Sequence, residues 1–182
     1  MNATTLPGNN QPSVPPGSLS GEQLLQCFAC KCDAQVQAAQ PNLSCMRQGT
    51  VKHDCCEREI QAHRASGQPP SIDGEHGYNM GPPLTGIVGS RTANFRAGTL
   101  PRGSLWPDAA VLDANGNVQK FIDFKFRCAT AKNQSAPTWS RRGGVSQGFR
   151  YHRLNRAMNP NCSPPEVVHN RACPPKGHSC PP

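Results

Sequence analysis

The spacing of apolar side chains predicts three helices. Between residues 20 and 39, apolar positions recur every three or four residues, so that one face of a helix would be hydrophobic. Ser20, followed three residues later by Gln23, has the pattern of a capping box, which marks a helix start. We therefore expect the first helix over 20–39. Its buried face would be formed by Leu25, Phe28, Cys32, Val36 and Ala39.

Two later segments show similar spacing. A second helix is expected over 51–65, before Gly67, because glycine commonly follows a helix C-terminus. A third is expected over 146–158, where Pro160 stops it. The buried side of this third helix would carry Phe149, Leu154 and Met158.

The clearest β pattern lies in residues 106–126. Two β-prone runs flank Asn115-Gly116, the dipeptide that most strongly predicts a tight hairpin. With these two residues at the centre of the turn, Asp108 falls opposite Asp123, and Lys125 shares the face of Asp123. A different loop type would shift this pairing. The other face would carry Ala109, Val111, Ile122, Phe124 and Phe126.

Other parts of the chain give weaker signals. Residues 67–105 are rich in glycine and proline, and we expect short strands near 86–88 and 93–95. A last short strand is expected at Val167-Val168. The first strand of the sheet is not defined by any pattern in this stretch.

The pattern indicates a single domain behind a leader. Residues 1–19 lack periodicity and are expected to be flexible. The domain would cover 20–182, with cysteine-rich helices at 20–66, a sheet-and-helix core at 67–170 and an irregular tail rich in cysteine and proline at 171–182. No run approaches the roughly 20 apolar residues of a membrane span, so none is expected.

Composition suggests that this domain needs cross-links. Hydrophobic residues make up 35% of the chain, and 17 glycines and 19 prolines imply long loops around a thin core. The 10 cysteines favour structural disulfides that tie the first two helices together and anchor the tail. Zinc is the alternative, since Cys27-x-x-Cys30 has a suitable spacing, but no clean second pair follows. A nucleophilic cysteine near His53 is a weaker alternative.

Positive charge is concentrated in the second half of the chain. The formal net charge is +8, and no acidic residue lies between Asp123 and Glu166. Such a surface suits a polyanion, and the guanidinium fork suits phosphates without reading a sequence. A generic solvated face is the alternative. The candidate nucleic-acid-binding residues are Arg127, Lys132, Arg141, Arg142, Arg150, Arg153 and Arg156.

The hairpin also gathers groups suited to phosphodiester hydrolysis. Two directly opposed carboxylates repel each other unless a divalent cation lies between them. Such a cation activates a water for attack on phosphorus, and Lys125 could orient that water or stabilise the negative transition state. Taken alone, Asp123-x-Lys125 favours a solvated strand face; Pro107-Asp108 at the matching register, with the hairpin turn between, favours the catalytic interpretation instead.

These residues resemble a known nuclease motif. Pro107-Asp108 followed by Asp123-Phe124-Lys125 is similar to the PD-(D/E)xK motif of restriction-endonuclease-like nucleases, and Gln147 with Tyr151 is similar to the Q-x-x-x-Y motif of their RecB-like branch. The resemblance covers roughly residues 50–170. It implies an α+β fold with an αβββαβ core, Mg²⁺ or Mn²⁺ as cofactor, and Gln147 and Tyr151 on a helix near the site.

The same resemblance implies an acidic residue from the helix before the sheet. Glu57 is the candidate for this third metal ligand beside Asp108 and Asp123, and Glu59 is the second choice. A solvated helix surface is the alternative explanation for both glutamates.

We expect a metal-dependent DNA endonuclease with little sequence preference. A short, basic, cysteine-rich nuclease resembles the toxin domains of bacterial polymorphic toxins and type VI secretion effectors. That resemblance implies delivery into the cytoplasm of a target bacterium and a cognate immunity protein. Two alternatives stay open: a ribonuclease with the same fold, and a basic binding module that is cross-linked by disulfides and has no catalytic activity. The sequence does not predict the oligomeric state.

Overall fold

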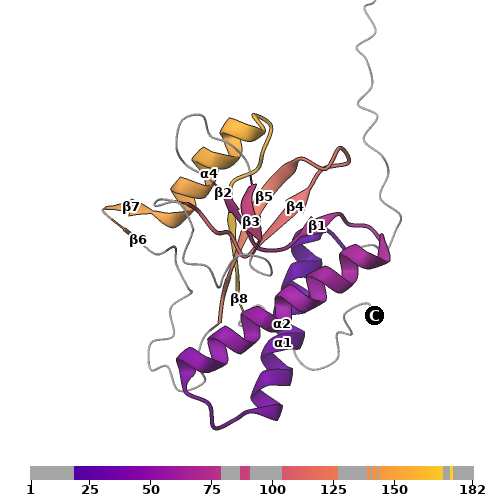
Figure 1. The fold of residues 1–182 in the computed structure, drawn as a ribbon, viewed down its shortest axis with the longest axis vertical. Helices are drawn as coiled ribbons and strands as arrows, with labels where there is room; N and C mark the ends of the chain where they lie inside the picture. Colours follow the sequence, from indigo (N-terminus) through magenta and orange to yellow (C-terminus); the bar gives the residue numbers. More distant parts are fainter. Residues whose placement is uncertain are drawn as a thin grey trace, which may run out of the picture.

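The protein combines helices with a mixed four-stranded sheet, so its fold is α+β. Figure 1 shows the sheet with helix α4 (Gln147–Met158) above it and the pair α1 (Gly21–Ala39) and α2 (Cys45–Ser66) below. No helix in the part of the chain described is long and apolar enough to cross a membrane. The computed structural model describes residues 19–78, 87–90, 104–126, 139, 141–142, 144–169 and 173.

Helix α1 has the predicted bounds, whereas α2 begins earlier than predicted. The side chain of Ser20 accepts a hydrogen bond from the Gln23 backbone, and the Gln23 side chain accepts one from Ser20, which completes the capping box. Most side chains of residues 45–50 are exposed, so this first part of α2 has no hydrophobic spacing to reveal it. Gly67 ends the helix with φ 66°, a left-handed conformation that glycine adopts without strain.

The four-stranded sheet has the order β1-β4-β5-β8. The strands are β1 (Ile72–Asp73), β4 (Ala109–Leu112), β5 (Val118–Lys125) and β8 (Glu166–His169). Strands β1 and β5 are antiparallel to β4, while β8 is parallel to β5. A parallel pair needs a crossover connection, and α4 lies in that connection. The predicted strand at Val167-Val168 is thus the edge strand β8.

Two small sheets stand beside the main one. Strand β2 (His76–Tyr78) pairs with β3 (Ile87–Ser90), which confirms the strand expected near 86–88. Strand β6 (Arg141–Arg142) pairs with β7 (Val145–Ser146) immediately before α4. The strand expected at 93–95 lies outside the described residues.

The turn between β4 and β5 differs from the predicted one. The backbone N–H of Asp113 donates to the carbonyl of Asn117 at 2.9 Å, and Gly116 donates back to the Asp113 carbonyl at 3.0 Å. The loop therefore contains residues 114–116 instead of Asn115-Gly116 alone. Gly116 has φ 80°, the left-handed conformation typical of this longer hairpin loop.

A β-bulge at Gln119 restores the predicted register beyond this loop. The pairs along the hairpin are Leu112 with Val118, Val111 with Lys120 and Ala109 with Ile122. Gln119 has no partner opposite it, which shifts the pairing by one residue. The extra loop residue and the bulge offset each other, so the open end of the hairpin has the pairing that a two-residue turn would give.

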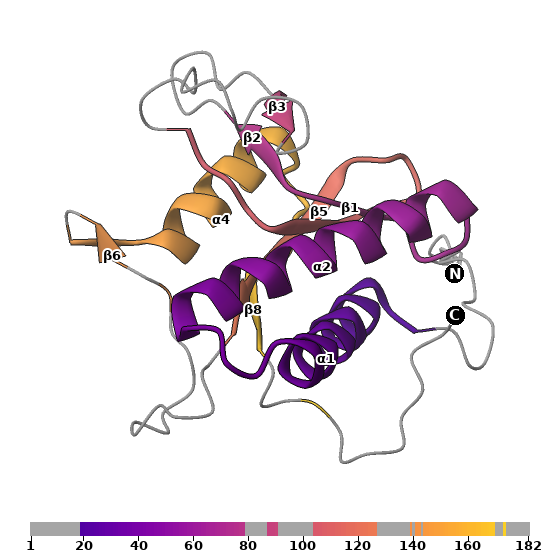
Figure 2. The ribbon, with the colours of Figure 1, turned by 60° about the horizontal axis from the view of Figure 1, so that its bottom comes forward.

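The two faces of the sheet support two separate cores. Alternate side chains of β4 and β5 point to opposite faces. Ala109, Val111, Ile122 and Phe124 pack against α1 and α2, as predicted, with Phe126 partly buried against them. Ala110 and Phe121 pack against α4. Figure 2 shows the sheet lying between α4 and the α1–α2 pair.

The prediction that Phe149 is buried is wrong. Its side chain is 61% exposed, whereas Leu154 is buried and Met158 is partly buried as expected. Tyr151 and the half-buried Trp139 fill the space against the sheet instead, with their rings edge to face at 5.7 Å. Phe149 precedes Leu154 by five residues and Met158 by nine, so it lies on the other side of α4 and faces solvent.

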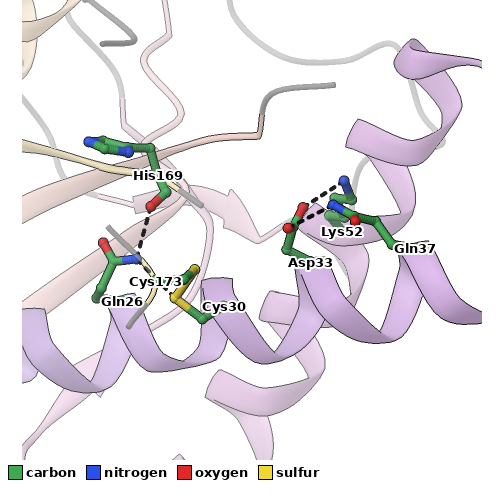
Figure 3. The surroundings of a disulfide bond; sticks show 7 residues. All are labelled: Gln26, Cys30, Asp33, Gln37, Lys52, His169 and Cys173. Carbon is green, nitrogen blue, oxygen red and sulfur yellow. Dashed lines mark hydrogen bonds and ion pairs between the residues drawn. A yellow bond between two sulfur atoms is a disulfide. The ribbon is translucent and has the colours of Figure 1, made fainter. Parts of the chain in front are cut away.

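Disulfides link the two pairs of segments that the sequence predicted to be linked. Cys32–Cys55 links α1 to α2, and Cys30–Cys173 links α1 to the tail. Figure 3 shows the second bond beside the hydrogen bond from Gln26 Nε2 to the carbonyl of His169, 2.9 Å long. Both contacts hold the end of β8 against α1. Cys27 and Cys45 are also disulfide-bonded, whereas Cys56 and Cys162 are free thiols.

Candidate active site

Asp108 and Asp123 meet at the open end of the β4–β5 hairpin. Asp108 immediately precedes β4, and Asp123 lies within β5. Oδ2 of Asp108 accepts a hydrogen bond from the backbone N–H of Phe124, 2.6 Å away. This bond holds the Asp108 carboxylate against β5, next to Asp123, as the predicted pairing requires.

The Asp123 carboxylate is buried, with its side chain only 4% exposed. Lys125, two residues along the same face of β5, forms an ion pair with Oδ2 of Asp123. Gln147 Nε2 donates a hydrogen bond to Oδ1 at 3.2 Å. The buried Oδ2 is in direct contact with the Lys125 ammonium, and the charge of His53 also favours the ionised carboxylate.

The site carries more negative than positive charge around Asp123. Burial raises the pKa of Asp123 from its ordinary 3.8 to about 6, and the negative charge of Asp108 contributes to the rise. Lys125 and His53 oppose this effect without cancelling it. An additional cation between the two carboxylates would reduce the part of this rise that comes from Asp108.

Gln147 and Tyr151 connect the Asp123 carboxylate to the chain before β4. Both side chains point from the first turns of α4 toward the sheet, as their spacing predicted. Gln147 Nε2 donates to Tyr151 Oη at 2.6 Å, and Tyr151 Oη donates to the carbonyl of Trp106 at 2.8 Å. Burial raises the pKa of Tyr151, with the charges of Asp123 and Asp108 adding to the rise, so its hydroxyl keeps its proton. The chain of bonds fixes the orientation of the Gln147 amide.

His53 of α2 is a residue of the site that the sequence analysis did not assign to it. Its Nδ1 lies 3.4 Å from Oδ1 of Asp108, and its ring packs edge to face on Phe126 at 5.2 Å. The available signal was indirect, because His53 lies one helical turn before the candidate Glu57. Each oxygen of Asp108 thus faces a different nitrogen, one from α2 and one from β5.

Glu57 is close to this region but takes part in other contacts. Its Oε2 accepts a hydrogen bond from the backbone N–H of Glu75 at 3.1 Å, and Oε1 accepts one from Gln61 at 2.9 Å. Glu59 forms an ion pair with Lys31 of α1 at 2.8 Å. Glu75 is itself buried, and its charge contributes to raising the Tyr151 pKa. Glu57 therefore holds the chain that carries Glu75 near the site.

Asp108 and Asp123 are the residues that could hold a metal ion. Among the described parts of the chain, no group of three or more His, Cys, Asp or Glu side chains is arranged to bind a metal. Glu57 is thus not brought together with both aspartates as a third ligand. Two carboxylates suffice for an oxygen-ligated ion that keeps several waters, as Mg²⁺ does.

The candidate nucleic-acid-binding residues are only partly described. Arg153 and Arg156 are exposed and Arg150 is half-buried, all on α4. Arg141 and Arg142 form β6, whose backbone alone is described. Arg127 and Lys132 lie outside the described residues.

Comparisons of this chain with protein-family models, with curated proteins and with solved structures found no match.

Proposed function

We propose that this protein is a metal-dependent nuclease that hydrolyses DNA phosphodiester bonds with little sequence preference. The observation that carries the proposal is the buried Asp123 carboxylate. It meets the Lys125 amine and the Gln147 amide, beside the negative charge of Asp108. A buried acid with a raised pKa costs stability, and such costs cluster at sites that do chemistry.

The order of elements supports this proposal. Along the chain, α2, β1, β4, β5, α4 and β8 follow one another in an αβββαβ sequence, with the small sheets inserted between them. Asp108, Asp123 and Lys125 come from the central hairpin, and Gln147 and Tyr151 from the next helix. The resemblance inferred from the sequence implies this same distribution of site residues.

In this proposal Asp108 and Asp123 hold Mg²⁺ or Mn²⁺. The negative charge of Asp108 disfavours ionisation of the buried Asp123, so a cation shared by the two carboxylates would relieve this repulsion. When bound, such an ion lowers the pKa of a water and offsets negative charge on the phosphate. His53 and the Phe124 N–H orient Asp108 from two sides, so the carboxylate is held before any ion arrives.

Apart from the two aspartates, Lys125 is the side chain that would contribute most to the reaction. Its ammonium, held by Asp123, would orient the attacking water and donate to a phosphate oxygen as negative charge develops there. Gln147 would keep Oδ1 of Asp123 in place, and Tyr151 would act through Gln147. Tyr151 is therefore a positioning residue in this scheme.

The choice of DNA as substrate and of a target bacterium as the place of action is based on the positive charge of the chain and on its resemblance to toxin nucleases. The arginines of α4 suit contacts with phosphates, which position a nucleic acid without reading its sequence. Disulfides are typical of proteins that pass through oxidising compartments, which agrees with a secreted antibacterial effector acting in the target cytoplasm. A cognate immunity protein belongs to the same proposal.

Plasmid digestion tests the activity. We expect the purified protein to nick supercoiled DNA with Mg²⁺ and to be inactive with EDTA. Asp123→Ala and Lys125→Ala should each lower the rate about a hundredfold or more. Glu166→Gln, a change of an exposed carboxylate on β8, is the matched control and should cut normally. Parallel digestion of RNA separates a ribonuclease from the proposed deoxyribonuclease.

Equal cutting by the wild type and Asp123→Ala would refute the proposal. A protein that binds DNA but never cuts it, with binding unchanged when Asp108, Asp123 and Lys125 are all replaced, would instead be a basic binding module.

A further inference from the structure

Helix α4 exposes an aromatic ring on the side that faces away from the sheet. Phe149 is 61% exposed, while Tyr151 and Leu154 fill the core on the other side. Arg153 and Arg156 follow Phe149 by four and seven residues, so they lie on the same side of the helix, and both are exposed. We refer to Phe149, Arg153 and Arg156 as the outer face of α4.

This surface carries charge of a single sign. The sequence of α4 contains arginines at 150, 153 and 156 and no acidic residue. Strand β7, which leads into the helix, adds a second exposed apolar side chain, Val145, at 41%. A polyanion that also presents flat apolar groups matches such a surface, and a nucleic acid combines these two features.

The outer face starts in the same helical turn as a residue of the proposed site, on the opposite side of α4. Gln147, the first residue of α4, donates a hydrogen bond to Asp123, and Phe149 belongs to the same first turn. Figure 1 shows β6 and β7 at one side of the molecule, with α4 running back from them. A strand with a phosphate at Asp123 reaches the outer face by passing around this first turn of α4.

We propose that the outer face of α4 binds single-stranded DNA next to the point of cleavage. The ring of Phe149 stacks on an unpaired base, and Arg153 and Arg156 contact the phosphates that follow. This inference rests on the proposed function, which supplies the strand at Asp123. Stacking on an aromatic ring accepts any base, so this contact selects unpaired bases and no particular sequence.

Binding measured without cleavage tests the inference separately from the activity. The probe is a short fluorescein-labelled single-stranded DNA, titrated in EDTA and followed by fluorescence anisotropy. Phe149→Ala should weaken binding about tenfold, and Phe149→Trp should retain it. Met46→Ala removes an apolar side chain that is 83% exposed on α2 and serves as the matched control. It should bind as the wild type does.

The dependence on salt distinguishes the two kinds of contact. Arg153→Gln and Arg156→Gln should each lower the slope of log affinity against log salt by about one, since each removes a phosphate contact. Phe149→Ala should leave that slope unchanged. A blunt duplex should lose less affinity than the single strand on Phe149→Ala, because its bases are already stacked.

Failure of the inference and failure of the proposed function give different results. If plasmid is cut but Phe149→Ala binds the single strand normally, the inference is overturned and the nuclease stands. If Phe149→Ala weakens binding but no variant or wild type cuts DNA, the single-strand contact of the outer face stands, while the nuclease proposal and the position of that contact next to a cleavage point fail. A wild-type dimer that Phe149→Ala converts to monomer, with DNA binding unchanged, would assign the surface to a second copy and also overturn the inference.

Discussion

The Asp108 carboxylate accepts a hydrogen bond from the backbone N–H of Phe124, 2.6 Å away. Phe124 directly follows Asp123, so the position of one acid is tied to the strand that carries the other. The spacing of the two acids consequently depends on the register of the hairpin, and a slip of one residue would separate them.

Asp123→Asn should stabilise the protein near neutral pH. The pKa of Asp123 is about 6 when folded, so between about pH 4 and pH 6 the folded state keeps a proton that the unfolded chain has released. The free energy of unfolding therefore falls as pH rises through this window, and the loss persists above it. Asparagine has no charge and avoids the loss. Since a pKa rise of about two corresponds to about 2.7 kcal/mol and asparagine loses the ion pair with Lys125, we expect a gain of about 1–3 kcal/mol at about pH 8 and little change at about pH 4.

Urea unfolding at both pH values measures this difference, with Glu166→Gln as a control for a lost exposed carboxylate. A gain of the same size at both pH values would show that the charge of Asp123 is not its cause.

Mg²⁺ should stabilise the wild type through the two aspartates. An ion that binds only the folded state adds about 2.7 kcal/mol when its free concentration is a hundred times its dissociation constant. We expect thermal unfolding of the wild type to shift upward with Mg²⁺, and that of Asp108→Asn and Asp123→Asn to shift much less. Sodium chloride at matched ionic strength controls for screening. Equal shifts in all three proteins would place the bound ion elsewhere.

The hairpin shows how far the sequence allowed the site to be predicted. The Asn115-Gly116 signal located the turn correctly, and alternation along β5 placed Asp123 and Lys125 on one face. The loop type was wrong, but the bulge at Gln119 compensated for the error. A bulge depends on the pairing of two strands, so a local pattern in one strand could not reveal it.

Local sequence patterns could not predict contacts between elements that are far apart in the chain. His53 meets Asp108 only because α2 packs across the sheet, and no local motif joins them. Phe149 was expected to be buried, yet its separation from Leu154 and Met158 places it on the other side of α4, and Trp139, from outside the helix, supplies an aromatic ring to that core. The short strand β1 has only two residues, too few for any periodicity to predict.

Tyr151→Phe should lower activity and stability together. The lost hydroxyl connects the Trp106 carbonyl to the Gln147 amide, so the change leaves two polar groups without this partner. We expect a cost of about 1–3 kcal/mol in the free energy of unfolding. The rate of DNA cleavage should fall with little change in KM, since Tyr151 acts on Asp123 through Gln147. Tyr78→Phe, in the same core, is the control and should cleave normally. Normal cleavage by Tyr151→Phe would exclude the positioning role.

Gly77→Ala and Gly49→Ala should change stability in opposite directions. A Cβ at Gly77 would overlap the indole of Trp106, whereas one at Gly49 in α2 would meet nothing within 4 Å. Gly77→Ala must therefore displace Trp106, whose carbonyl holds Tyr151, and should cost about 1–3 kcal/mol in stability and slow DNA cleavage. Gly49→Ala lowers the backbone entropy of the unfolded chain and should add about 0.5–1 kcal/mol without affecting cleavage. Urea unfolding and plasmid digestion of both variants measure these effects. Unchanged stability and cleavage in Gly77→Ala would show that the close packing of Trp106 on β2 does not support the site.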